Sequence, residues 1–160
     1  MTRRNAMRTA LLAALALALL PVAGIAQPSP PPTPPPGCTV GGLDGSQLLG
    51  CMPSTGWNGD LVVFAHGYVA PGETVAIPYD QLEIDGTSIP AIVTGLGFAF
   101  ATTSYRTNGL AIKEGVEDVA DLVVVFAKPP RERPRHVYLG GASEGGLVTT
   151  LAVEQLDGFS

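Results

Sequence analysis

The sequence predicts an α/β fold, a three-layer α/β/α sandwich with a mostly parallel sheet, on two observations. Three short apolar runs, at residues 61–65, 98–105 and 136–140, have the length and composition of strands buried on both faces. Segments with helical signals follow each of these runs. Regular alternation of strand and helix requires crossover connections, which produce parallel strands with helices on both faces of the sheet.

The first 26 residues have the pattern of a secretory signal peptide. Three arginines precede an apolar stretch at residues 10–20, which is short for a bilayer span. Small residues at positions 24–26 predict cleavage after Ala26. An uncleaved membrane anchor is the alternative. We therefore expect the protein to be secreted or periplasmic.

Cleavage would make the chain more acidic. The full sequence has 9 basic and 14 acidic residues, and its formal net charge is −5. Loss of the three arginines of the signal leaves 6 basic residues against 14 acidic ones, a net charge of −8. Such a surplus of acidic groups disfavours nucleic acid or an anionic membrane surface as a partner.

Residues 27–37 form a proline-rich linker, which we expect to be extended because proline joins neither a helix interior nor a central strand. The domain then occupies residues 38–160. Its two cysteines, Cys38 and Cys51, both follow the signal. In an oxidising compartment such a pair indicates a disulfide rather than a metal site, and two free thiols are the alternative.

Local signals place the elements between the apolar runs. Ser88 is the expected N-cap of a short helix, Pro90 lies in its first turn, and Gly95 or Gly97 can end it. An early strand and a turn are indicated at residues 46–52 and 54–60.

Residues 110–127 combine strand and helix signals, and their periodicity favours a helix. Acidic residues recur at helical spacing on one face, namely Glu114, Glu117, Asp118 and Asp121. Apolar residues recur at the same spacing on another face, namely Val116, Val119, Ala120 and Val123. A helix separates the two sets, whereas a strand would mix them. We interpret the acidic stripe as a solvated face, and we expect a further helix at residues 144–156.

Gly141-Ala142-Ser143-Glu144-Gly145 is a G-x-S-x-G pattern between the last predicted strand and that helix. A very tight strand-to-helix turn forces its serine to positive φ, and leaves room only for glycine two residues away on either side. The turn exposes the hydroxyl, and directs the next amide to where an oxyanion would form. We interpret Ser143 as a nucleophile, with a merely structural turn as the alternative.

A second candidate segment, His66-Gly67-Tyr68, directly follows the strand at residues 61–65. A His-Gly dipeptide there lets the backbone turn and present an amide towards the serine. The expected oxyanion donors are the backbone amides of Tyr68 and Glu144, with the Gly67 backbone also in the hole and His66 supporting the loop. Each such donor lowers a reaction barrier by about 3–4 kcal/mol.

The segments WNGDLVVFAHGY, TTSYRTNG and GGASEGG have the order and spacing of the N-terminal half of an α/β-hydrolase. The chain resembles this family over about residues 50–156, in particular secreted esterases and prolyl-oligopeptidase-like hydrolases. The resemblance implies a Ser–His–acid triad with Ser143 as nucleophile, and cleavage of a carboxylic ester, or of a peptide as the alternative. An acyltransferase is a third option. No metal-ligand spacing and no nucleotide-binding pattern is present, so we expect neither a metal nor a cofactor.

The triad implied by the family is incomplete in this sequence. The family's acid and histidine follow the nucleophile helix, and the sequence stops at Ser160, so we expect an inactive fragment of a longer hydrolase. His136 begins the strand whose far end carries Ser143, about 15 Å away. His66 is expected to orient its loop rather than act as the base, and the Glu144 side chain to point away from the hydroxyl. A non-catalytic secreted binding module is the alternative function.

Overall fold

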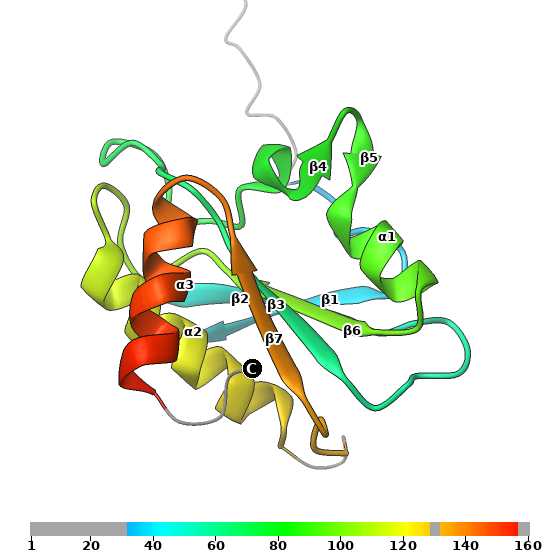
Figure 1. The fold of residues 1–160 in the computed structure, drawn as a ribbon. Helices are drawn as coiled ribbons and strands as arrows, with labels where there is room; N and C mark the ends of the chain where they lie inside the picture. Colours follow the sequence, from blue (N-terminus) through cyan, green and yellow to red (C-terminus); the bar gives the residue numbers. More distant parts are fainter. Residues whose placement is uncertain (1–31, 129–131, 157–160) are drawn as a thin grey trace, which may run out of the picture. The chain divides into compact units, whose positions relative to one another are not determined.

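The computed structural model describes residues 32–128 and 132–156. The predicted signal peptide and the first part of the proline-rich linker lie outside the described residues. The main sheet and its helices (Figure 1) are built from β1 (Cys38–Leu43), β2 (Ser46–Cys51), β3 (Leu61–Ala65), α1 (Ile89–Gly95), β6 (Ala99–Thr103), α2 (Ile112–Phe126), β7 (Val137–Gly141) and α3 (Glu144–Gln155). Between β3 and α1 lie η1 (Tyr79–Leu82), β4 (Glu83–Ile84) and β5 (Thr87–Ser88). None of the helices in these ranges has the length and apolar composition needed to cross a membrane.

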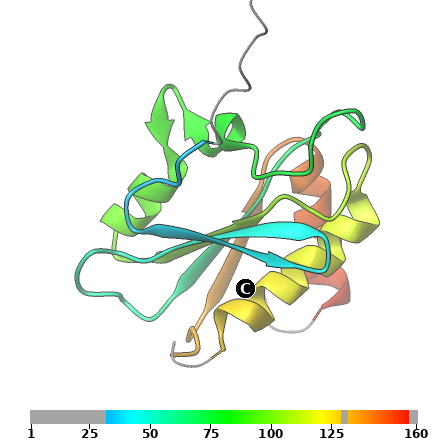
Figure 2. The same ribbon diagram turned by 180° about the vertical axis from the view of Figure 1, so that it is seen from behind.

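The central layer is a five-stranded sheet in the order β1-β2-β6-β3-β7. The three strands predicted from apolar runs, β6, β3 and β7, are mutually parallel. The prediction of a mostly parallel sheet is nevertheless wrong, because β1–β2 and β2–β6 are antiparallel and the sheet is mixed. A hairpin (Figure 2) makes β1 antiparallel to β2, and its turn residues Asp44 and Gly45 both have positive φ, the conformation that tight hairpin turns need.

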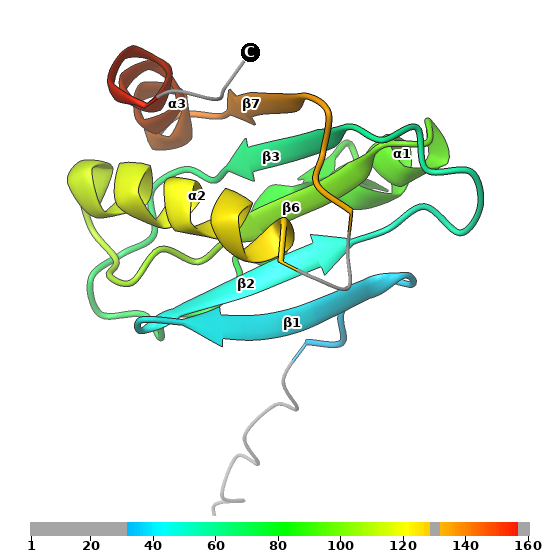
Figure 3. The same ribbon diagram turned by 90° about the horizontal axis from the view of Figure 1, so that it is seen from below.

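Helices cover both faces of the sheet (Figure 3), so the predicted three-layer arrangement is confirmed. α2 and α3 pack on one face, and α1 packs on the other. Alternate residues of β6 separate the two cores, because successive side chains of a strand point to opposite faces. Ala99 and Ala101 belong to the core under α2 and α3, whereas Phe100 belongs to the core that includes Ile89 and Val93 of α1.

The first helix, α1, begins and ends as its local signals predict. Ser88 Oγ accepts a hydrogen bond from the amide of Ala91 at 3.3 Å, and Pro90 lies in the first turn. After the helix ends at Gly95, Gly97 takes a positive φ of 86° and turns the chain into β6.

The predicted disulfide between Cys38 and Cys51 is present. The two residues pair directly across the β1–β2 ladder, at the end opposite the hairpin turn. The bond therefore closes the open end of the hairpin. The sequence contains no apolar run that predicts β1. This strand, with the sequence CTVGGL, lies largely exposed at the sheet edge.

The acidic stripe of α2 is only partly a solvated face, so that interpretation is wrong for one of its members. The Asp118 side chain is 2% exposed. Its carboxylate accepts hydrogen bonds from the Arg106 amide at 2.6 Å, from Arg106 Nε at 2.8 Å and from Arg106 Nη2 at 2.5 Å. Glu117 and Asp121 also lie within salt-bridge distance of Arg106. Asp118 thereby fastens the loop after β6 onto α2.

The Asp118→Ala variant should lose about 3 kcal/mol of unfolding free energy, because three hydrogen bonds to a buried carboxylate disappear together. Urea denaturation measures this loss. The matched control is Glu117→Ala, whose side chain is 49% exposed and 3.6 Å from Arg106. We expect that control to change stability by no more than about 0.5 kcal/mol. Equal losses in the two variants would contradict the assignment.

Candidate active site

The loops that carry the two predicted site segments meet at one edge of the sheet. Ala65, the last residue of β3, pairs with Gly141, the last residue of β7. Parallel strands end at the same edge, so the turn at residues 66–68 and the turn at Ser143 are neighbours. They are in direct contact, because a Cβ atom built on Gly67 would lie 3.2 Å from Ser143 Cβ.

Ser143 has the strained backbone that a very tight strand-to-helix turn imposes. Its φ is 54° and its ψ is −120°. Few residues other than glycine adopt positive φ, and such strain persists only where the surroundings enforce it. The side chain is exposed. The helix begins immediately, since the amide of Gly146 donates to the carbonyl of Ser143 at 3.0 Å.

The glycines on either side of Ser143 are required by close backbone contacts. A Cβ atom on Gly145 would overlap the carbonyl group of Ala65, and one on Gly141 would overlap the carbonyl group of Gly145. In contrast, a Cβ atom on Gly146 would meet no atom closer than 3.9 Å. The turn at Ser143 therefore packs its backbone directly on the end of β3, and this contact brings Ser143 to the turn at residues 66–68.

Two backbone amides at this junction are free to bind an anion. Within residues 32–128 and 132–156, neither the Tyr68 amide nor the Glu144 amide donates a hydrogen bond to another protein group. The Gly67 amide differs, because it donates to Gln81 Oε1 at 2.7 Å. Gly67 therefore leaves space beside Ser143 because it has no side chain, but its amide is not available as a donor. Of these three amides, only those of Tyr68 and Glu144 can serve an oxyanion.

His66 supports the turn from the protein interior. It is 1% exposed, and its ring stacks on that of Tyr105 with 4.0 Å between the centroids. Nδ1 lies 2.6 Å from the carbonyl oxygen of Gly67, so Nδ1 carries the proton. The carbonyl of a trans peptide points opposite to its N–H, so this bond also orients the Tyr68 amide. Burial lowers the pKa of His66, although the backbone of Gly67 and of Ser104 opposes the shift. The ring is therefore neutral.

Tyr105 is a support residue to which the sequence assigned no role. It is 2% exposed and has a φ of 54°. Its hydroxyl donates a hydrogen bond to the carbonyl oxygen of His66 at 3.0 Å. Burial raises the pKa of Tyr105, and the carboxylates of Glu144 and Asp118 raise it further, so the phenol remains a neutral donor.

The loop after β6 joins the two site loops. It pairs with the loop after β3 through a bridge, in which the Gly109 amide donates to the Val69 carbonyl at 2.8 Å. It also meets the turn at Ser143, since the Ala111 amide at the start of α2 donates to Glu144 Oε1 at 2.7 Å. The Glu144 side chain is thus bound at the N-terminus of α2. Its Oε2 is buried and has no hydrogen-bond partner among the described residues.

The second histidine lies far from this junction. His136 precedes the amino end of β7, whereas Ser143 follows its carboxyl end. Its side chain is 58% exposed, and Nδ1 lies 3.0 Å from Asp60 Oδ1. Neither histidine is placed as the base for Ser143. His66 Nε2, the nitrogen left to accept a proton, is buried and has no hydrogen-bond partner among the described residues, so it does not contact the Ser143 hydroxyl. His136 lies at the other end of β7.

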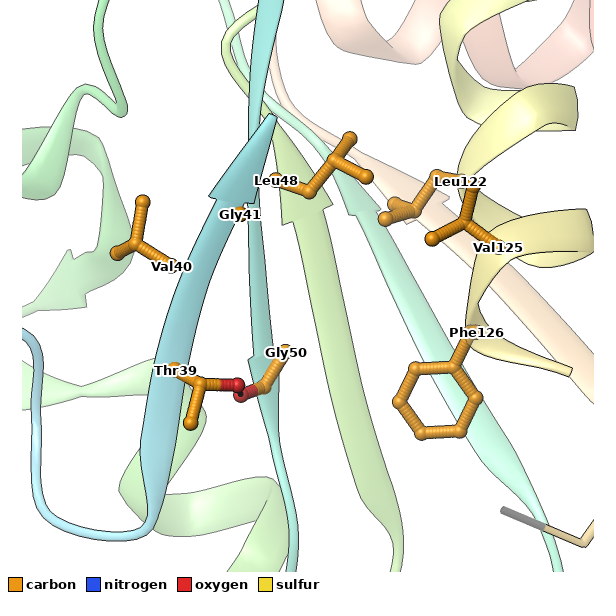
Figure 4. A pocket seen from close by; sticks show the side chains of 8 residues that line it. All are labelled: Thr39, Val40, Gly41, Leu48, Gly50, Leu122, Val125 and Phe126. Atoms are coloured by element: carbon orange, nitrogen blue, oxygen red, sulfur yellow. Dashed lines mark hydrogen bonds between the residues drawn. The ribbon is translucent and has the colours of Figure 1, made fainter. Parts of the chain in front are cut away.

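A cavity of about 270 Å³ lies elsewhere, between the β1–β2 hairpin and the C-terminal half of α2 (Figure 4). Its walls include Val40, Leu48, Leu122 and Phe126. Neither Ser143 nor any residue of the turn at 66–68 lines it, so this cavity is separate from the candidate active site.

The fold has a counterpart among solved structures. The chain is similar to an alpha-beta serine hydrolase homologue from Coxiella burnetii, with a TM-score of 0.53 and 16% sequence identity. The similarity covers 74% of this chain and 57% of that chain, so this chain spans little more than half the length of the homologue. At such identity the likeness establishes a partial match to an α/β-hydrolase fold. No family model matches the sequence, and no curated protein matches it.

Replacing Gly145 or the adjacent Gly146 by alanine should change the free energy of unfolding in opposite directions. Gly145→Ala places a methyl group against the Ala65 carbonyl, so we expect a loss of about 3 kcal/mol or more of unfolding free energy. Gly146→Ala makes only an ordinary contact, 3.9 Å from the Gly141 carbonyl oxygen, within a helix, and should gain up to about 1 kcal/mol. Chemical denaturation measures both changes. Equal stability of the two variants would show that the turn does not press on β3.

The neutral His66 ring should make stability depend on pH. The unfolded chain protonates this histidine near its ordinary pKa of 6.5, whereas burial lowers the pKa in the folded state. The contribution to stability is therefore present above pH 6.5 and is lost as the pH falls further. Unfolding free energies measured between about pH 5 and pH 8 should show this decline, and His66→Gln should remove part of it. The exposed-site variant His136→Gln serves as the control. A decline that persists unchanged in His66→Gln would refute this origin.

Proposed function

We propose that the protein is a secreted serine hydrolase that cleaves a carboxylic ester through an acyl-enzyme on Ser143. One observation carries the proposal. Ser143 is exposed on a strained turn, in contact with a second turn, and the free amides of Tyr68 and Glu144 lie in these two turns.

The proposed reaction uses this geometry in two stages. Ser143 Oγ attacks the ester carbonyl carbon, the C=O electron pair moves to oxygen, and a base takes the hydroxyl proton. The two amides stabilise the oxyanion that forms, and each contributes about 3–4 kcal/mol. When the intermediate collapses, the protonated base gives its proton to the leaving alcohol, and the acyl group remains on Ser143. Water then releases the acid by the same steps.

The base in this proposal comes from outside the described residues. A base must lie within hydrogen-bond reach of the hydroxyl. His66 Nε2 is buried without a hydrogen-bond partner among the described residues and so does not contact the hydroxyl, and His136 lies at the opposite edge of the sheet. The proposal therefore assigns the histidine and the acid of the triad to other residues.

A non-catalytic secreted binding module is the second candidate function. It is favoured by the same placement of the two histidines, which leaves the Ser143 hydroxyl without an activating partner among the described residues. In this alternative the strained turn is an inherited feature of the fold and binds no oxyanion.

The disulfide supports the compartment that we propose. A bond between Cys38 and Cys51 persists outside the reducing cytosol. In the sequence it lies in the part of the domain that is closest to the predicted signal peptide, which itself falls outside the described residues.

A fluorophosphonate probe separates the two candidate functions. A form of the protein that includes the residues proposed to supply the base should be labelled on Ser143, because the probe requires an activated serine beside an oxyanion hole. Ser143→Ala should abolish labelling, whereas Ser54→Ala, a change at another exposed serine, should leave it intact. Mass spectrometry of the labelled peptide identifies the site. Absence of labelling in this form of the protein would favour the binding module.

A further inference from the structure

We propose that Gln81 is the positioning residue that orients the turn at residues 66–68 for oxyanion binding, a role that rests on the proposed function. The side-chain amide of Gln81 makes two hydrogen bonds to this turn. Oε1 accepts from the Gly67 amide at 2.7 Å, and Nε2 donates to the Tyr68 carbonyl at 3.1 Å. These bonds flank the Gly67–Tyr68 peptide, whose N–H is the proposed oxyanion donor.

The polar groups of the turn can be accounted for completely. The Gly67 amide and the Tyr68 carbonyl bind Gln81, and the Gly67 carbonyl binds His66 Nδ1. The Tyr68 amide is the one polar backbone group of these two residues that has no described partner. A backbone amide without a protein partner needs water or a ligand. The side chains therefore hold every other backbone polar group of Gly67 and Tyr68, and leave the Tyr68 amide without a described partner.

Gln81 is close to the nucleophile without being a catalytic residue. A Cβ atom on Gly67 would lie 3.0 Å from Gln81 Oε1 and 3.2 Å from Ser143 Cβ. The Gly67 backbone thus lies against both residues, and Gln81 acts on Ser143 only through that backbone. A primary amide suits this position because it accepts and donates at a fixed spacing, as a neighbouring strand would.

Gln81 is itself fixed by the segment that carries it. It lies in η1, where its amide donates to the Pro78 carbonyl at 2.9 Å. The next residue, Leu82, is 2% exposed and packs in the same core as Ile77 and Phe100. Because the segment that carries Gln81 is packed in the core, the Gln81 side chain can hold the turn at residues 66–68 in a fixed position relative to the core.

The first test measures the turn directly and does not depend on activity. In Gln81→Met, amide hydrogen exchange at Gly67 should accelerate by about tenfold or more, because its acceptor is removed while the side-chain volume is nearly kept. The matched control is Gln47→Met. Gln47 Oε1 accepts from the Ile77 amide at 3.3 Å, so this variant loses a similar bond, but it has no hydrogen bond to the turn. Exchange at Gly67 should be unchanged in the control.

The second test measures ester hydrolysis, with an aryl acetate as substrate, by a form of the protein that includes the residues proposed to supply the base. Gln81→Met should lower kcat by about tenfold or more and change KM by less than about threefold, because a misoriented amide affects mainly the transition state. Gln47→Met should change neither parameter by more than about twofold. A purely structural role of Gln81 would instead affect the melting temperature and leave kcat of the folded protein intact.

Gln81→Glu provides a signature in the pH profile. An ionised carboxyl still accepts from the Gly67 amide, but it cannot donate to the Tyr68 carbonyl and adds negative charge beside an oxyanion. The protonated carboxyl restores both bonds. The activity of Gln81→Glu relative to the wild type should therefore rise as the pH falls through the pKa of the introduced carboxyl. A ratio independent of pH would count against the assignment.

The outcomes distinguish this inference from the proposed function. Faster exchange at Gly67 together with a lower kcat in Gln81→Met supports both. Unchanged exchange in Gln81→Met, or an unchanged kcat in an enzyme whose Ser143→Ala variant is inactive, overturns the role of Gln81. Faster exchange in a protein without Ser143-dependent hydrolysis supports the control of the turn by Gln81 and rejects the proposed function.

Discussion

The arrangement of the site depends on one close contact, that of the Gly145 backbone with the carbonyl group at the end of β3. No side chain fits between them. Because the contact joins the start of α3 to the strand that leads into residues 66–68, it fixes two loops by backbone packing alone. The positive φ of Ser143 follows from the same contact, since the chain must leave β7 and enter α3 within two residues. The strain at the serine is therefore held by the sheet itself.

Buried side chains complete what the backbone contact begins. His66 and Gln81 bind the polar groups of the turn beside Ser143, and the buried Tyr105 hydroxyl donates a hydrogen bond to the carbonyl of His66. Asp118, through Arg106, fastens the loop that carries Tyr105 onto α2. Each of these groups is neutral or paired, as the pKa shifts of His66 and Tyr105 towards their uncharged forms require. The result is a turn with a single amide left for a ligand.

The sequence predicted features that depend on neighbours in the chain, and missed those that depend on distant partners. The strands in apolar runs and the glycine-flanked Ser143 are local patterns, and both lie where they were expected. The antiparallel edge was missed because β1 (Cys38–Leu43) exists only through pairing with β2. Burial of Asp118 requires Arg106, twelve residues earlier. Gln81 lies in a short turn without periodicity, and only the folded chain places its amide against Gly67.

The central claim is that backbone packing places Ser143 and the amides of Tyr68 and Glu144 around one anion site. A crystal structure of the protein, in a form that includes the residues proposed to supply the base, after treatment with an organophosphate ester tests it most directly. The account predicts a phosphoryl group on Ser143 Oγ, positive φ at Ser143, and a phosphoryl oxygen within about 3 Å of both amide nitrogens. A relaxed helical or extended backbone at Ser143, or a phosphoryl oxygen bound by neither amide, would contradict it.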